Sequence, residues 1–111
     1  MGLLSFFADR RSARQLAGLA AEIAQRSHGD VWQRVAHRAT AMRLVEARGY
    51  VRARAARVIH HHVHAALETR PEISDARREE LISLATEVVI SAIARELLHL
   101  PQRVVPRRQA A

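Results

Sequence analysis

The stretch from residue 30 to residue 69 contains no proline and only one glycine, Gly49, and this feature constrains the fold more than any other. Its apolar and small residues recur at intervals of three, four and seven positions, which is the periodicity of one face of an α-helix. Asp30 is suited to cap the first turn, Gln33 completes a capping-box pattern, and Pro71 closes the other end. The stretch therefore predicts a long central helix over residues 30–69.

Two more helices are expected on either side of this one. The first covers residues 3–28 and stops at Gly29, because glycine accepts the left-handed conformation that often ends a helix. The third covers residues 74–100, with Ser74 as its cap and a proline after its last residue. Both connections are short, so neighbouring helices should run in opposite directions.

The expected fold is all-α: an antiparallel three-helix bundle with a long central helix, in a single domain over residues 1–100. A kink near Gly49, which would give a four-helix arrangement, is the alternative. Residues 101–111 contain two prolines and three arginines and are expected to form a basic, disordered tail. The chain has no cysteine and no apolar run long enough to span a membrane, so we expect a cytoplasmic protein without disulfides.

Positive charge gathers in the predicted central helix. Residues 31–70 hold eight arginines against two acids, and lysine is absent from the whole chain. Guanidinium groups bind phosphates in bidentate fashion, so nucleic acid or an acidic protein is a candidate partner. The alternative is a solvated face whose arginines pair with acids of the third helix or of a partner. The candidate polyanion-binding residues are Arg34, Arg38, Arg48, Arg52, Arg103, Arg107 and Arg108.

A histidine run at residues 60–64 suggests a metal site. His60 and His64 are four residues apart, so on a helix they share a face and could chelate Zn²⁺ or Ni²⁺. Further ligands are not evident, and packing histidines on an amphipathic helix are the alternative. Glu96 and His99 form one Glu-x-x-His pattern, the half-motif of di-iron bundles, but a second copy is absent and an ion-pair network is the favoured interpretation.

Self-association is expected at the far half of the central helix. The first helix is too short to cover positions beyond about residue 55, yet an apolar stripe continues there. Such a stripe would be covered most simply by a two-fold partner. The candidate self-association residues are Ile59, Val63, Ala66 and Leu67.

The pattern of reactive residues does not indicate an enzyme. A nucleophile with its base, a glycine-rich phosphate loop and an isolated pair of carboxylates are all missing from the sequence. We therefore expect a small basic helical binding or assembly module without a cofactor, forming homo-oligomers such as a homodimer. Nucleic-acid or polyanion binding is the first alternative, and metal binding through His60 and His64 is the second.

Overall fold

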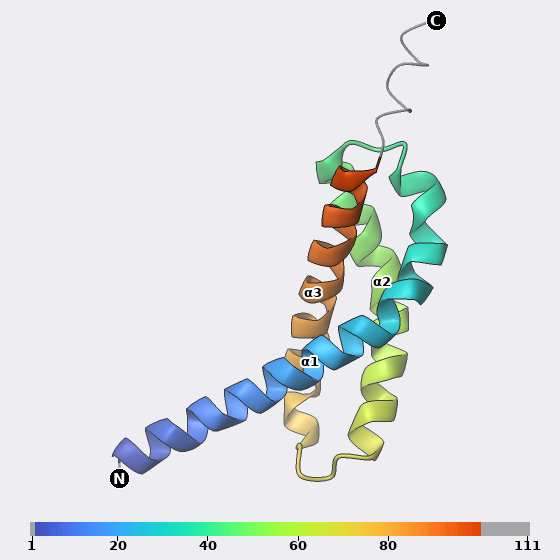
Figure 1. Ribbon diagram of the computed structural model, residues 1–111. Helices are drawn as coiled ribbons and strands as arrows, with labels where there is room; N and C mark the ends of the chain where they lie inside the picture. Colours follow the sequence, from blue (N-terminus) through green and yellow to red (C-terminus); the bar gives the residue numbers. More distant parts are fainter. Residues whose placement is uncertain (1, 101–111) are drawn as a thin grey trace, which may run out of the picture.

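The computed structural model describes residues 2–100, with side chains described from residue 9 onward. This part of the chain folds into three α-helices and one short 3₁₀ helix, with no strand among the described residues. Each α-helix packs against the other two, and Figure 1 shows α2 returning alongside the end of α1 while α3 climbs back beside both. The elements are α1 (Gly2–Ala39), α2 (Leu44–Glu68), η1 (Asp75–Arg77) and α3 (Arg78–His99).

A four-residue repeat runs through the buried face of all three helices. Rows of side chains four positions apart form ridges, and two such sets interdigitate when helices cross at about 50°. Figure 1 shows α1 passing obliquely over α2 and α3. The rows are Ile23, Ser27, Val31, Val35 and Ala39 in α1; Ala47, Val51, Ala55, Ile59, Val63 and Leu67 in α2; and Leu81, Ala85, Val89 and Ile93 in α3.

The first predicted helix boundary is wrong, because α1 continues through Gly29 and Asp30 without interruption to Ala39. Gly29 does not have the positive φ of a helix-ending glycine. Val31 and Val35 are fully buried on the same row as the preceding turns, so packing of the α1 row offsets the helix-weakening effect of Gly29, about 1 kcal/mol relative to alanine.

The predicted long central helix over residues 30–69 is also wrong, because the chain breaks at residues 40–43. The Thr40 hydroxyl donates to the carbonyl of His37 at 3.2 Å, which competes with the helical hydrogen bonds there. Arg43 is extended, and its backbone N–H donates to the Glu46 carboxylate at 3.2 Å, which caps the start of α2. The break therefore falls before Gly49, which lies within the continuous helix α2.

The third predicted helix is close to the observed one. Ser74 is extended and precedes η1, although its side chain makes no capping hydrogen bond. The predicted tail, residues 101–111, lies outside the described residues, as do Arg103, Arg107 and Arg108. None of the described helices has the length and hydropathy to cross a membrane.

Candidate functional site

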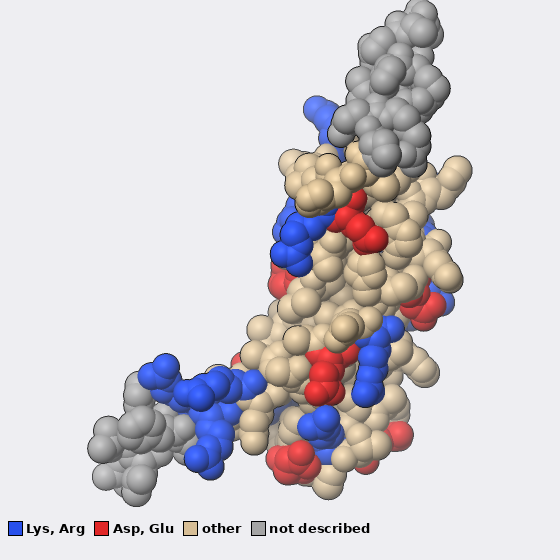
Figure 2. Space-filling view, viewed as in Figure 1, with Lys and Arg blue, Asp and Glu red and all other residues tan. Residues whose placement is uncertain are grey.

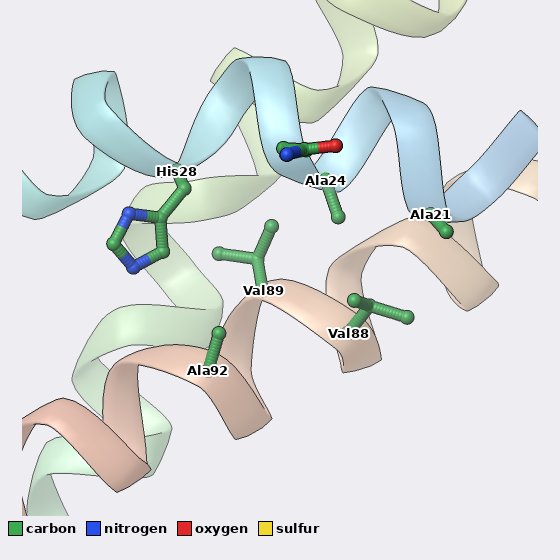
Figure 3. Close-up of a pocket in the computed structure, with 7 residues that line it drawn as sticks. Ala21, Ala24, His28, Val88, Val89 and Ala92 are labelled. Carbon is green, nitrogen blue, oxygen red and sulfur yellow. The ribbon is translucent and has the colours of Figure 1, made fainter.

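An apolar groove lies on the surface between α1 and α3. It has a volume of about 350 Å³ and is lined by Ala21, Ala24, Gln25, His28, Val88, Val89 and Ala92, which together are called the α1/α3 groove here. Figure 3 shows the alanines of α1 facing the valines and alanine of α3, with the His28 ring at one end. The residues facing each other are mostly small, so they leave a hollow where longer side chains would have filled the space.

The groove is apolar and open to solvent. Val88 keeps 41% of its surface exposed, and Leu84, one turn earlier on α3, keeps 37%. Ala21 is exposed on the opposite wall, whereas Ala24 and Val89 at the floor are buried. Burying apolar surface contributes about 25 cal/mol of stabilising free energy per Å². Covering Val88 and Leu84 with a partner would therefore stabilise the resulting complex.

A contact between His28 and Glu96 lies at one end of the groove. His28 Nε2 lies 2.8 Å from a Glu96 carboxylate oxygen, and this contact joins α1 to α3. His99 instead uses its Nδ1 with the carbonyl of Arg95, at 2.7 Å. Glu96 and His99 therefore make separate contacts, and Glu96 contacts a histidine that the sequence pattern did not connect to it, so the expected ion-pair network stays a prediction.

The predicted arginine surface is divided between two helices. Arg34 and Arg38 are exposed on α1, while Arg48 and Arg52 are on α2. Arg52 forms an ion pair with Glu87 of α3. The hydrogen bond from Arg52 lowers the pKa of Glu87, partial desolvation opposes this shift, and the charges of Arg52 and Arg48 reinforce it. The charge of Arg52 is thus partly neutralised within the chain.

The Arg52–Glu87 pair predicts a specific pH dependence. Because the folded-state pKa of Glu87 lies below its ordinary value of 4.5, the pair stabilises the fold above that value, and the contribution is lost as pH falls through the lowered pKa. We expect Glu87→Gln to lower the melting temperature slightly at pH 7 and to have no effect below that lowered pKa. Thermal unfolding followed by circular dichroism from pH 2 to pH 7 measures this. An equal effect of Glu87→Gln across that range would contradict it.

His60 and His64 lie exposed on successive turns of α2. His64 Nε2 lies 3.4 Å from a carboxylate oxygen of Glu68, one further turn along. Among the described residues, no three histidine or acidic side chains are grouped closely enough to hold a metal ion. The metal site at His60 and His64 therefore stays a prediction.

The predicted self-association stripe is wrong in its position. Ile59 and Val63 are fully buried and Leu67 nearly so, all within the core of a single chain, and Ala66 packs against that core. The first helix was expected to end too early to reach them, but the bundle is assembled differently, with the chain turning at residues 40–43. These residues are occupied by intramolecular packing and do not offer a surface.

The sequence pattern alone did not predict a site at the α1/α3 groove. A signal is present, because Ala21, Ala24 and His28, with Ala17 one turn before them, recur at gaps of three and four positions in α1. Small residues of this kind are equally consistent with a solvent-facing helix, so only the position of α3 beside them defines a groove. Comparison with protein families, with curated proteins and with solved structures found no match to this chain.

Proposed function

We propose that this protein is a non-catalytic assembly module that forms homo-oligomers through the α1/α3 groove. The observation that carries the proposal is the exposed apolar surface of Val88 and Leu84, at and beside a groove lined mostly by alanine and valine. Small residues on both walls allow another helix to approach closely, since the distance between packed helix axes, 8–10 Å in proteins, depends on the side chains at the contact. The lining is mostly apolar, and its polar residues are Gln25 and His28, of which His28 already contacts Glu96.

The test is the state of association of the whole chain. Sedimentation equilibrium from micromolar to millimolar concentration should show a concentration-dependent oligomer for the wild type, and Val88→Asp should shift it to monomer. Val45→Asp is the matched control, because Val45 is 83% exposed on α2 and is not part of the groove. Circular dichroism checks that both variants keep their helix content. A monomeric wild type, or an assembly unchanged by Val88→Asp, would contradict the proposal.

A second candidate function is polyanion binding, and the exposed arginines of α1 favour it. Arg34 and Arg38 make no ion pair with an acid of residues 9–100, whereas Arg52 is paired with Glu87. If nucleic acid binds here, affinity should fall steeply with salt. Arg34→Gln and Arg38→Gln should each reduce the slope of log affinity against log salt by about one.

Arg52→Gln provides the comparison, because its charge is already compensated and its removal should change the slope less. Fluorescence anisotropy with a labelled DNA duplex at 50–300 mM salt measures all three variants. Binding that does not depend on salt, or equal effects of Arg34→Gln and Arg52→Gln, would argue against this second function.

A further inference from the structure

The beginning of α1 extends beyond the bundle. The first buried residue described in α1 is Leu16, and residues 2–15, called the N-terminal arm here, continue the helix away from α2 and α3 (Figure 1). Most of the arm from residue 9 onward is exposed, and Figure 2 shows arginines gathered on it. An isolated helix of about this length is only marginally stable in water, so the arm gains stability from a surface against which it can pack.

The arm and the groove lie on one continuous face of α1. Beginning at Leu3, one seam of residues follows alternating gaps of four and three positions, which is the 3.5-residue periodicity of helices that pack lengthwise against each other. This seam differs from the four-residue row that faces the core. Its members are Leu3, Phe7, Arg10, Arg14, Ala17, Ala21, Ala24 and His28.

The two ends of this seam are complementary in size. Its first members, Leu3 and Phe7, are large and apolar, whereas Ala21 and Ala24 are small and line the groove. If two α1 helices lie antiparallel about a two-fold axis between positions 14 and 17, Phe7 of one chain is opposite Ala24 of the other. A two-fold contact then fills both grooves at once, and closed two-fold pairs are the commonest assemblies.

The middle of the seam fits the same arrangement. Arg10 and Arg14 would lie opposite Ala21 and Ala17 of the second chain. An alanine leaves room for the methylene stem of an arginine, whose guanidinium can remain in water at the edge of the contact. In a parallel pair, by contrast, each arginine would meet its own copy, which places like charges together.

We infer that the α1/α3 groove is filled by the N-terminal arm of a second copy of this chain, with the two α1 helices packed antiparallel along this seam. The inference rests on the proposed assembly function and names the segment that occupies the groove. It also accounts for a helix that continues beyond its own bundle, because the arm of each chain packs against the body of the other.

The first experiment separates this inference from the assembly function itself. The double variant Leu3→Ser/Phe7→Ser changes only the arm, and Val88→Asp changes only the groove; each should weaken dimerisation by about 100-fold or more. Mixing the two variants should restore a heterodimer detected by light scattering, because one intact arm meets one intact groove. If Val88→Asp gives monomers while the arm variant stays fully dimeric, the arm is not the occupant and only the assembly function stands.

The direction of packing is tested with introduced cysteines, since the chain has none of its own. A disulfide requires Cβ atoms within about 3.5–4.5 Å. Phe7→Cys chains mixed with Ala24→Cys chains should form a heterodisulfide under mild oxidation, whereas Phe7→Cys alone should not cross-link. Cross-linking of Phe7→Cys with itself would show a parallel pair and overturn the inference. So would a monomeric wild type that binds vesicles of phosphatidylglycerol through Leu3 and Phe7, because the arm would then be a membrane anchor.

Discussion

Replacing Ile59 with alanine is expected to lower the free energy of unfolding by about 2–5 kcal/mol. Ile59 is fully buried in the α2 row, and its side chain belongs to the core formed by all three helices. Truncation removes the transfer free energy of three carbon atoms and leaves a cavity that the surrounding helices only partly fill. Urea denaturation followed by circular dichroism at 222 nm measures the loss.

The control for this prediction is Val45→Ala. Val45 is 83% exposed on the same helix, so its truncation should change the free energy of unfolding by no more than about 0.5 kcal/mol. The comparison distinguishes the observed fold from one in which Ile59 belongs to a solvent-facing stripe. An equally small effect of Ile59→Ala, accompanied by dissociation of an oligomer, would show that Ile59 lies between chains and would contradict the three-helix core described above.

Replacing Gly29 with proline is expected to cost about 3 kcal/mol or more. Gly29 lies within the continuous helix α1, where proline removes a backbone hydrogen bond and its ring clashes with the carbonyl one turn earlier. Gly29→Ala should act in the opposite direction and stabilise the protein by up to about 1 kcal/mol. A Cβ atom at this position would meet nothing within 4 Å, so alanine fits without strain.

These two substitutions decide where the first helix ends. If Gly29 were a helix-ending glycine with positive φ, alanine there would destabilise the protein and proline would have a smaller effect than in a helix interior. Thermal unfolding of wild type, Gly29→Ala and Gly29→Pro gives the order of stability directly. An order in which Gly29→Ala is less stable than the wild type would contradict the continuous α1 helix.

A continuous α1 also matters for the proposed assembly. Residues of the N-terminal arm and residues of the α1/α3 groove are positioned relative to each other by one helix, so the 3.5-residue seam from Leu3 to His28 stays in register. Across the same helix, the four-residue row from Ile23 to Ala39 packs against α2 and α3. One element thus carries two faces with different periodicities: the inner face packs within the bundle, and we propose that the outer face contacts a second copy.

The amino-acid sequence by itself determined that the chain is helical and where its helices can exist. Strong helix formers, apolar residues at helical spacing and the absence of proline before Pro71 are local properties, and they act before any tertiary contact forms. The third helix was predicted nearly to its ends for the same reason, since proline at residue 101 stops it.

Only the tertiary structure decided where the first two helices divide. Gly29 is a strong local signal, but packing of Val31 and Val35 carries the helix through it, whereas residues 40–43 contain neither glycine nor proline and yet form the turn. Because the helix boundary differs from the predicted one, different residues face inward. Ile59 and Val63 are buried in the core, and the exposed apolar groove lies at Ala21 and Val88. A groove belongs to two helices at once, and the spacing of residues within either helix does not specify which neighbour lies beside it.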